Sequence, residues 1–372
     1  MSPDRYDERL ARTMTGIGEA GLGGLLVTPG ANLGYLTGYA PMPLERLTVL
    51  VLGVGRDPVM LVPMLERPAA LAAPVGERIE IVGWTDAEDP YTLAARLLGT
   101  SDGAASGGAY AISDDAWASH VLGLERAATT IRLVPQGEAL PLIRAVKDPD
   151  ELERLRAAAR GADAAFGEVV RLPFAGRREL DVAGELARLL RDHGHELVDF
   201  TIVGSGPNSA SPHHEAGERT IEPGDAVVMD FGGVAGGYCS DITRTVFVGE
   251  PSEEQRLVYD VVRAAQQTAF EAIRPGVACE TVDRAARAVI EQAGYGERFI
   301  HRTGHGIGIE VHEPPYIVGG NATPLEPGMT FSDEPGIYLP DRFGVRIEDQ
   351  LEVTAEGARR MNEAPRELTV VA

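Results

Sequence analysis

Cysteine is scarce in this sequence of 372 residues, and its scarcity excludes two kinds of small structural scaffold. The only cysteines are Cys239 and Cys279. Two residues are too few for a disulfide framework, and they stand too far apart for a cage of metal-binding thiolates. The sequence therefore favours a reducing environment, and we expect a cytoplasmic protein.

Positive charge and long apolar runs are also in short supply. The sequence has 34 Lys and Arg against 56 Asp and Glu, which gives a formal net charge of -22. Such a chain repels phosphate backbones and anionic lipid surfaces, which argues against nucleic acid and membranes as partners. The polar residues 1–9 lack the apolar centre of a signal peptide, and no later run reaches transmembrane length. We expect neither export nor membrane anchoring.

The length and the hydrophobic pattern predict two domains, because 372 residues exceed the usual span of one hydrophobic core. Up to residue 134, helical and strand-like patterns alternate, which is typical of an α/β domain. Helical patterns occupy residues 6–20, 66–74, 92–98 and 116–125, and strand-like patterns occupy residues 24–27, 47–53, 58–62, 109–112 and 130–134. Between them, the Gly-, Ser- and Ala-rich residues 99–108 predict a surface loop.

A polar connector that ends in proline, residues 141–149, predicts a domain boundary. We place a smaller N-terminal domain at residues 1–143 and a larger domain at residues 144–372. The larger domain has helical patterns, separated by strand signals and Gly/Pro turns, at residues 150–170, 179–194, 252–274 and 279–294. This mixture indicates the α+β class.

The second domain contains a weak internal repeat that delivers carboxylates in pairs. Glu222-Pro223-Gly224 precedes an apolar run that ends at Asp230, and Glu326-Pro327-Gly328 precedes, at the same distance, a run that ends at Glu334. In each copy a glycine then stands four residues before a second acid. Each copy thus supplies two acidic residues.

The second acids of the two copies are Asp241 and Glu348. Residues 231–237, between Asp230 and Asp241, are rich in glycine and predict a β-hairpin. With its tip at Ala235-Gly236, Asp230 would lie directly opposite Asp241, with both side chains on one face. Glu334 and Glu348 flank a turn near residues 340–342 in the same way. Two hairpins could thus direct four carboxylates at one place, where their mutual repulsion requires cations.

His305 is the natural nitrogen donor for such a site, because its flanking glycines allow the backbone and a metal to approach closely. Carboxylates with one imidazole suit manganese, cobalt, iron or zinc. His312 follows seven residues later, so an extended segment would put the two imidazoles on opposite faces. A bend near Gly306 or Gly308 is required if both rings serve one cleft.

Each of these features also has a purely structural explanation. Acidic residues on hairpins are usually solvated, and a neighbouring glycine usually marks only a turn. His213 could belong to a polar loop, and Arg346 could be a surface charge. The conjunction favours a metal site: two carboxylate hairpins within apolar strands, separated by a histidine that glycines frame.

The second domain resembles the peptidase family that contains prolidase, aminopeptidase P and, more distantly, methionine aminopeptidase and creatinase. The resemblance rests on residues 202–209 (IVGSGPNS) leading to Pro212-His213, and on residues 229–232 (MDFG), 240–245 (SDITRT), 304–308 (GHGIG), 333–338 (DEPGIY) and 345–349 (VRIED). The first domain resembles the creatinase-type N-terminal domain, through residues 25–38 and the connector at residues 144–151.

This resemblance implies a pita-bread α+β fold with internal pseudo-twofold symmetry, which agrees with the repeat. It also implies two divalent metal ions. Asp230 and Asp241 would hold one ion, Asp241, His305 and Glu334 would contribute to the other, and Asp241 and Glu348 would bridge the two. Manganese is the expected metal, with cobalt, zinc and iron as alternatives.

The reaction implied is hydrolysis of the peptide bond before proline, by a water that the cations activate. Glu334 would move the proton. His213 and His312 would contact the substrate and stabilise the developing oxyanion or the proline-side group, and Arg346 would support this cluster near Glu348.

Several activities stay open at this point. A single catalytic domain behind one short N-terminal domain, together with residues 204–213, favours an Xaa-Pro dipeptidase. Aminopeptidase P differs by accepting a longer C-terminal extension of the substrate. A relative that acts on a small non-peptide substrate is a further alternative, because a fold does not fix a function. A non-enzymatic binding protein would not need all five ligands. The family also leads us to expect a homodimer.

Overall fold

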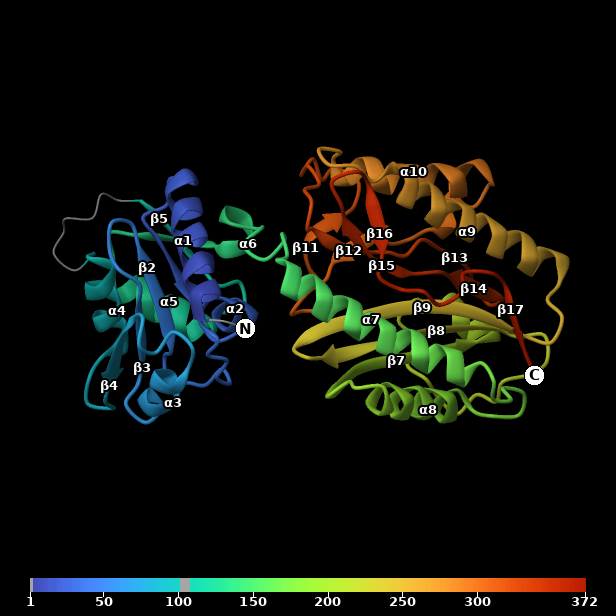
Figure 1. Ribbon diagram of the computed structural model, residues 1–372, viewed down its shortest axis with the longest axis horizontal. Helices are drawn as coiled ribbons and strands as arrows, with labels where there is room; N and C mark the ends of the chain where they lie inside the picture. The colour runs from blue at the N-terminus through green and yellow to red at the C-terminus, as the bar shows by residue number, and fades with distance from the viewer. Residues whose placement is uncertain (1–2, 101–107) are drawn as a thin grey trace. The chain divides into compact units, whose positions relative to one another are not determined.

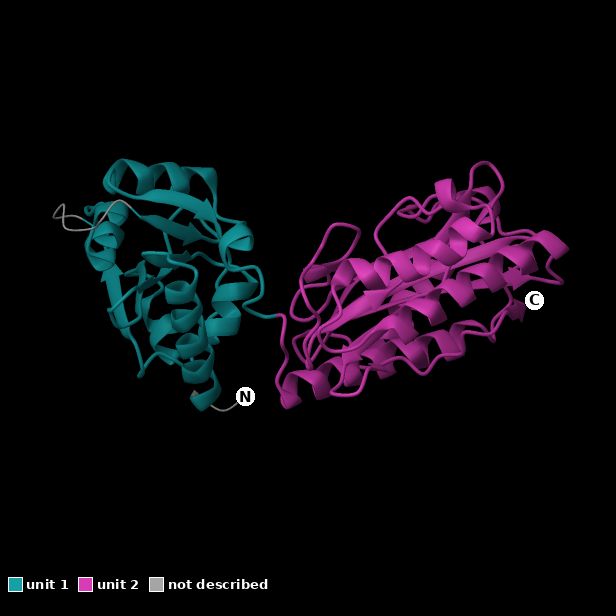
Figure 2. Cartoon of the chain, turned by 90° about the horizontal axis from the view of Figure 1, so that it is seen from above, with its two compact units in different colours: residues 1–144 teal, residues 145–372 magenta. Residues whose placement is uncertain are grey.

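The computed structural model describes residues 3–100 and 108–372, so most of the predicted loop at residues 99–108 lies outside the described part. The chain divides into two compact units, residues 1–144 and residues 145–372 (Figure 2). Each unit has its own cluster of buried apolar side chains, so each is described by itself.

Unit 1 is built on a six-stranded mixed sheet with the order β4-β3-β2-β1-β5-β6 (Figure 1). Its strands are β1 (Gly24–Val27), β2 (Val49–Gly53), β3 (Val59–Pro63), β4 (Glu80–Trp84), β5 (Ala109–Ile112) and β6 (Arg132–Pro135). Its helices are α1 (Pro3–Glu19), α2 (Ala31–Thr37), α3 (Arg67–Ala72), α4 (Pro90–Leu98), α5 (Ala118–Ala127) and α6 (Gln136–Ala139). The predicted α/β class is confirmed, whereas β4, α2 and α6 were not predicted.

Unit 2 begins with helix α7, whose start is fixed by local chemistry. The Asp148 carboxylate accepts from the backbone N–H groups of Asp150 and Glu151, and the Glu151 carboxylate accepts from the Asp148 N–H. Pro149 occupies the first helical position, where no N–H is needed. The proline-closed connector seen in the sequence is therefore a helix N-terminus.

The rest of unit 2 is α+β. The helices are α7 (Pro149–Val169), α8 (Glu179–Asp192), α9 (Glu253–Ala272) and α10 (Cys279–Gln292), with short 3-10 turns η1 (Gly206–Ala210) and η2 (Gly296–Arg298). The strands are β7 (Leu197–Ser205), β8 (Ala226–Ala235), β9 (Tyr238–Val248), β10 (Gly304–Gly306), β11 (Glu313–Ile317), β12 (Thr330–Asp333), β13 (Gly336–Leu339), β14 (Phe343–Arg346), β15 (Asp349–Val353), β16 (Ala358–Arg360) and β17 (Thr369–Val371).

These strands form three sheets, with the orders β17-β9-β8-β7, β11-β10-β12-β15-β16 and β13-β14. Helices α7 and α8 pack on the first sheet, and α9 and α10 pack on strands of the other two (Figure 1). This is the pita-bread arrangement that the family resemblance implied.

The internal repeat is visible as matched backbone contacts in the two halves of unit 2. Gly224 and Gly328 both have positive φ, 95° and 91°. The Gly224 N–H donates to the Val248 carbonyl at 2.7 Å, and the Gly328 N–H donates to the Val353 carbonyl at 2.9 Å. Each glycine closes a turn before a strand that leads to the site. The predicted pseudo-twofold symmetry is therefore present in the backbone itself.

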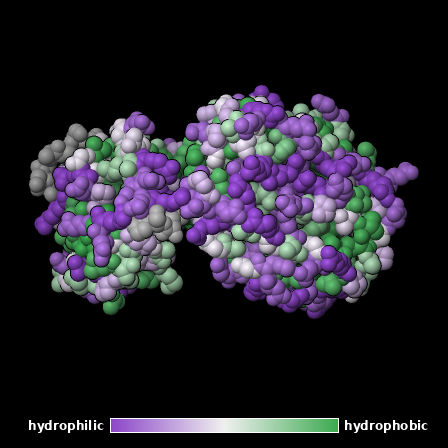
Figure 3. Space-filling model, in the orientation of Figure 1, coloured by the Kyte–Doolittle hydropathy of each residue, from purple (hydrophilic) through white to green (hydrophobic). Residues whose placement is uncertain are grey.

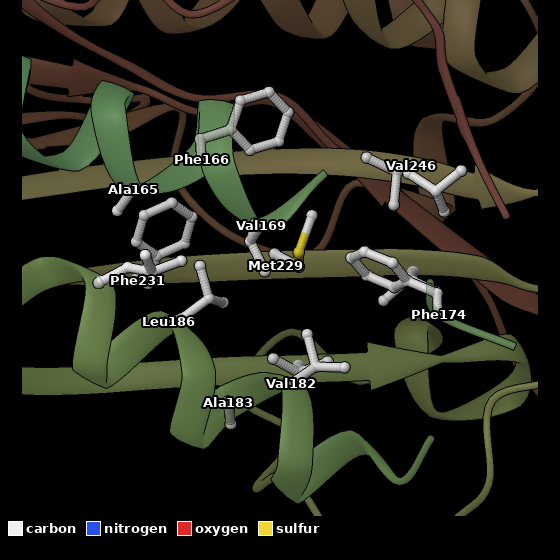
Figure 4. Packing of buried hydrophobic residues seen from close by; sticks show 14 of the residues in the cluster. Ala165, Phe166, Val169, Phe174, Val182, Ala183, Leu186, Met229, Phe231 and Val246 are labelled. Atoms are coloured by element: carbon white, nitrogen blue, oxygen red, sulfur yellow. The ribbon is translucent and has the colours of Figure 1, made fainter. Parts of the chain in front are cut away.

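The core of the first half of unit 2 joins the two helices to the sheet. Phe166 of α7 and Leu186 of α8 pack with Met229 and Phe231 of β8 (Figure 4). All four side chains are almost fully buried. Because burial of a side chain of this size contributes about 1.5–3 kcal/mol, this layer fixes β8, which carries Asp230.

The hairpin of β8 and β9 corrects the predicted register. Ala235 pairs with Tyr238, so the tip is Gly236-Gly237, with φ of 58° and 78°. A two-residue tip of this kind needs positive φ at both positions, which glycine supplies without strain. Asp230 therefore lies opposite Thr243 and not opposite Asp241. The two carboxylates still share one face, as diagonal neighbours, because the pairing differs by two residues and the side-chain period is two.

The second hairpin has its turn where it was predicted. Leu339 of β13 pairs with Phe343 of β14, which leaves residues 340–342 as the turn. Asp333 of β12 pairs with Asp349 of β15 in continuous register with this hairpin. Glu334 and Glu348 lie between the two strand pairs, where the ladder is interrupted: the Glu334 N–H donates to the Thr303 carbonyl and the Glu348 N–H donates to the Thr243 carbonyl.

The surface of unit 2 is mainly polar on the face shown in Figure 3, with scattered apolar groups, in keeping with the negative charge of the chain. No helix within residues 3–100 and 108–372 has the length and apolarity that a membrane crossing requires.

Candidate active site

One pocket of unit 2, about 480 Å³ in volume, brings together the eight site residues that the sequence predicted. They are the candidate ligands Asp230, Asp241, His305, Glu334 and Glu348, and the candidate catalytic residues His213, His312 and Arg346, with Glu334 assigned to both groups. The hairpin β8–β9, strand β10 and the ends of β12 and β14 converge on this pocket. The wall also includes Phe200, Ile202, Pro212, His301, Arg302 and Val311.

Three of the candidate ligands form a tight group. One donor atom each from Asp241, His305 and Glu348 lies within 4.8 Å of the other two, and all three side chains are buried. Asp230 and Glu334 stand beside this group, where Glu334 Oε1 lies 3.2 Å from His305 Nε2. Asp241, His305 and Glu348, with Glu334 beside His305, thus have the donor types and the proximity that a metal centre requires, and Asp230 lines the same pocket.

Three carboxylate oxygens of this pocket, within the part of the chain that the structure describes, are buried without a hydrogen-bond donor. They are Asp230 Oδ1, Asp241 Oδ1 and Glu348 Oε1. Burial, together with the neighbouring negative charges, raises the pKa of Asp241 and of Glu348 well above the ordinary values. Buried oxygens without partners are costly, and a divalent cation would satisfy them. The donor set therefore fits a metal.

His305 is held in the tautomer that a metal ligand needs. Its Nδ1 lies 3.1 Å from the carbonyl oxygen of Gly306, which can only accept, so Nδ1 carries the proton. The lone pair of Nε2 then faces Asp241 and Glu334, at 3.5 and 3.2 Å. A backbone carbonyl that fixes the ring in this way is a common support for metal-binding histidines.

The predicted bend after His305 is confirmed. The pairing of β10 with β11 shifts register between His305 and Gly306, and residues 307–312 leave the sheet before β11 begins. The ring centroids of His305 and His312 are consequently 3.9 Å apart. Both imidazoles serve one pocket, as the sequence analysis required.

Arg346 forms hydrogen bonds with several segments that surround the pocket. Its side chain is 2% exposed, and its Nη2 lies 2.6 Å from Asp230 Oδ2 and 3.3 Å from the Pro212 carbonyl. Its Nη1 donates to the Tyr338 hydroxyl and its Nε to the Thr243 hydroxyl, at 2.7 and 3.1 Å. Arg346 therefore orients a candidate ligand and the segment that leads into His213.

Sequence reasoning did not assign a role to His301, Tyr338 or Thr243. The Tyr338 hydroxyl lies 2.8 Å from His301 Nε2, and the Thr243 hydroxyl donates to Glu348 Oε2 at 2.6 Å. All three stand in or beside segments that the resemblance used. Tyr338 contacts His301, which is 37 residues away, and Thr243 contacts Glu348, which is 105 residues away. No local sequence pattern reveals contacts over such separations.

The adjacent histidines 213 and 214 point in different directions. His213 lines the pocket, whereas His214 Nε2 lies 2.8 Å from Oε2 of Glu179, whose side chain is fully buried. The same carboxylate accepts from the backbone and hydroxyl of Ser205, both at 2.7 Å, and from the Asn208 amide. Glu179 thus ties down both ends of the loop that presents His213.

The fold and the pocket together define a metal-dependent hydrolase with a pita-bread catalytic unit. The chain belongs to metallopeptidase family M24, whose model matches residues 153–355, and its residues 9–146 match the creatinase/prolidase N-terminal domain. It is accordingly a metal-dependent peptidase.

The similarity to individual relatives spans almost the whole chain. The probable dipeptidase PepE of Mycobacterium tuberculosis is 45% identical over 370 residues, which cover 98% of this chain and 96% of that protein. The Xaa-Pro dipeptidase of Lactobacillus helveticus is 37% identical over 347 residues, covering 91% and 92%. The crystal structure of dipeptidase PepE from Mycobacterium ulcerans matches with a TM-score of 0.94 at 42% identity, covering 100% of this chain and 99% of that chain.

Proposed function

We propose that the protein is an Xaa-Pro dipeptidase that works with two divalent metal ions. The observation that carries the proposal is the group of buried carboxylate oxygens around His305 to which none of the described residues donates a hydrogen bond. Asp230, Asp241, His305, Glu334 and Glu348 would hold these ions. Manganese is the proposed metal, and cobalt, zinc and iron suit the same donors.

When bound, the two cations supply an activated water and polarise the scissile carbonyl. Glu334 would move a proton to the nitrogen of the departing proline. Glu334 Oε1 accepts from the Ser332 hydroxyl at 3.0 Å and lies 3.2 Å from His305 Nε2, which holds the carboxylate at the edge of the pocket where that proton would be transferred.

His312 is proposed to donate a hydrogen bond to the oxygen on which negative charge develops. Partial burial in the pocket, with His305 beside it, lowers the pKa of His312 to about 4, so the ring is neutral near pH 7. The Arg302 guanidinium lies 3.4 Å from His312 Nδ1 and can only donate, so the ring proton resides on Nε2. His213, on the opposite side of the loop from His214, is the second candidate donor.

The pocket wall supports a dipeptide as substrate. Phe200, Ile202 and Val311 offer apolar contacts, and Arg302 offers a positive charge. Within the described residues no carboxylate lies within ion-pair distance of Arg302, whose guanidinium stacks 4.5 Å from the Tyr316 ring centre. A free α-carboxylate, which a dipeptide presents directly after proline, would be its natural partner. Because the Xaa-Pro bond lacks an N–H, recognition must depend on such groups around it.

The deciding experiment compares Ala-Pro with Ala-Pro-Ala, after chelation and again after addition of manganese. Manganese-dependent cleavage that favours Ala-Pro supports the dipeptidase. A preference for the tripeptide would assign aminopeptidase P activity instead. No cleavage of either peptide by metal-loaded protein would rule out both and leave a small non-peptide substrate as the alternative.

A substitution of Arg302 tests the carboxylate contact separately. Arg302→Gln should raise KM for Ala-Pro by roughly 10- to 100-fold, the size of a lost charged hydrogen bond. The KM for Ala-Pro-amide, which has no terminal carboxylate, should change little. Equal effects on both substrates would contradict the assignment. A homodimer and a cytoplasmic location remain predictions, which size-exclusion chromatography with light scattering and cell fractionation can check.

A further inference from the structure

A fully buried ion pair of unit 2 includes the residue that follows His312 and lies outside the proposed chemistry. Lys147 Nζ is 2.6 Å from Glu313 Oε1, and each side chain is 1% exposed. The two residues are 166 positions apart in the chain. Glu313 directly follows His312, so its carboxylate and the His312 imidazole are carried by adjacent positions of one segment.

The Glu313 carboxylate fills the inside of the bend at residues 306–313. A Cβ atom on Gly308 would stand 2.4 Å from Glu313 Oε1, so the bend closes around the carboxylate with no room for a side chain there. Glu313 also pairs with Gly306 across β10 and β11, at the point where the register shifts. The carboxylate therefore lies against the backbone of the bend at Gly308.

Lys147 is itself anchored to the other half of the site. Its backbone N–H donates to the Gly328 carbonyl at 2.9 Å, and Val146 forms an isolated bridge with Met329. Gly328 closes the turn before β12, which leads to Glu334. The ion pair thus joins the bend that carries His312 to the turn that precedes Glu334.

We propose that the Lys147–Glu313 ion pair is a positioning device that holds His312 beside His305. Removing two charges from water is costly, and apolar residues of similar volume often stabilise a fold as well or better. A buried pair is therefore best explained by the geometry that it imposes, here the 3.9 Å approach of the two rings. The inference rests on the proposed role of His312 in the reaction.

The test removes both charges at once. In Lys147→Met/Glu313→Leu, the free energy of unfolding should return close to the wild-type value, whereas either single change should lower it by leaving one charge buried alone. If the pair positions His312, kcat for Ala-Pro in the double variant stays about tenfold or more below wild type, with KM little changed. Recovery of both stability and kcat would show a purely structural pair and overturn the proposal.

A second variant covers the case in which the double variant folds poorly. Glu313→Asp keeps the charge but shortens the side chain by one methylene, so the pair can persist only if the bend shifts. A several-fold fall in kcat with KM unchanged is expected, and an unchanged kcat would refute the positioning role. The matched control is Arg156→Met/Glu352→Leu, which removes an ion pair of unit 2 that does not line the pocket, and it should leave kcat unchanged.

A structural measurement tests the positioning role of the ion pair without relying on the proposed activity. A crystal structure of the metal-loaded double variant shows directly whether the His312 ring has moved away from His305. A displaced ring in a protein whose wild type cleaves no Xaa-Pro peptide would support the positioning device and reject the dipeptidase. An undisplaced ring would reject the positioning device, whatever the substrate.

Discussion

At the scale of single residues, the two adjacent histidines of the 205–217 loop divide their roles between chemistry and structure. His213 is exposed in the pocket, and His214 is bound to a buried carboxylate. A sequence shows only that two imidazoles are adjacent. The direction of each ring depends on Glu179, which stands at the start of α8, 35 residues before His214.

Substitution should separate these two roles. His213→Ala should lower kcat/KM by roughly 100-fold, the usual cost of losing a transition-state donor, with the free energy of unfolding changed by less than about 0.5 kcal/mol. His214→Ala should instead lower that free energy by about 1–3 kcal/mol, because it removes a partner from the buried Glu179 carboxylate. Steady-state kinetics and urea unfolding of both variants check the contrast. The assignment fails if His214→Ala leaves stability untouched.

Glu179 also predicts a pH dependence of stability. Burial raises its pKa, but hydrogen bonds from Ser205 and His214 outweigh this and bring the pKa below its ordinary value of 4.5. The unfolded chain therefore binds the proton at a higher pH than the folded chain does. The stabilisation is complete above pH 4.5 and is lost as the pH falls through the folded pKa.

The corresponding measurement compares urea midpoints of wild type and Glu179→Gln from pH 7 to pH 3. Both carboxylate oxygens of Glu179 accept hydrogen bonds in the wild type, from Ser205, Asn208 and His214. The variant should be less stable at pH 7, because the glutamine amide has one oxygen that accepts and an NH2 group that only donates. The difference between the two proteins should shrink as the pH falls below 4.5, since only the wild type loses a charge there. Parallel profiles over the whole range would contradict this account.

At the scale of elements, the β8–β9 hairpin decides where two carboxylates stand. Some of its glycines are required by backbone conformation, and another is required by a close approach between the strands. Gly236 and Gly237 have positive φ and open space around them, so they serve the turn. Gly232 lies opposite Asp241, and a Cβ there would stand 2.0 Å from the Ser240 carbonyl oxygen.

Gly232→Ala should therefore displace β9 beside Asp241 and weaken metal retention. We expect a lower manganese content per chain after dialysis, measured by elemental analysis, and a kcat that falls with it. Gly236→Asn is the matched control, because Asn tolerates positive φ and nothing lies within 4 Å of the added atom. Equal metal loss in both variants would mean that the close approach at Gly232 has no role in the site.

The same hairpin shows what sequence reasoning can and cannot reach. The apolar run that ends at Asp230 and the glycine run that follows it predicted the element and the shared face of Asp230 and Asp241. The register depended on which two residues make the tip, and Ala235-Gly236 and Gly236-Gly237 are both plausible tips in a glycine run. The second hairpin was placed correctly because its turn, residues 340–342, is framed by strands without such a choice.

At the scale of the whole molecule, the long-range contacts of the site escaped prediction. The ligand types were readable because each stands in a distinctive local pattern. The contacts of Lys147 with Glu313 and of Tyr338 with His301 were not, because each joins two segments that are distant in sequence. The repeat made part of the long-range architecture predictable, since Gly224 and Gly328 mark equivalent turns in the two halves.

The division into two units predicts which parts of the molecule metal binding stabilises. A ligand that binds only the folded site stabilises the unit that contains it by RT ln(1 + [L]/Kd), which is about 2.7 kcal/mol at a hundredfold excess over Kd. The pocket draws its candidate ligands from residues 230–348, all within unit 2, and unit 1 has a separate core. Manganese should therefore slow amide hydrogen exchange in β8, β9, β12 and β15, and leave β1, β2 and β5 unchanged.

Hydrogen–deuterium exchange measured by mass spectrometry, with and without manganese, checks this expectation. Asp241→Asn provides the control, because it removes a carboxylate that is proposed to bind both ions, and its exchange should not respond to the metal. If manganese slowed amide exchange equally in both units of the wild type, the two units would unfold together. Metal binding would then stabilise unit 1 as well, although the site lies in unit 2. Protection confined to unit 2, and lost in Asp241→Asn, would locate both the metal and its stabilising effect in residues 145–372.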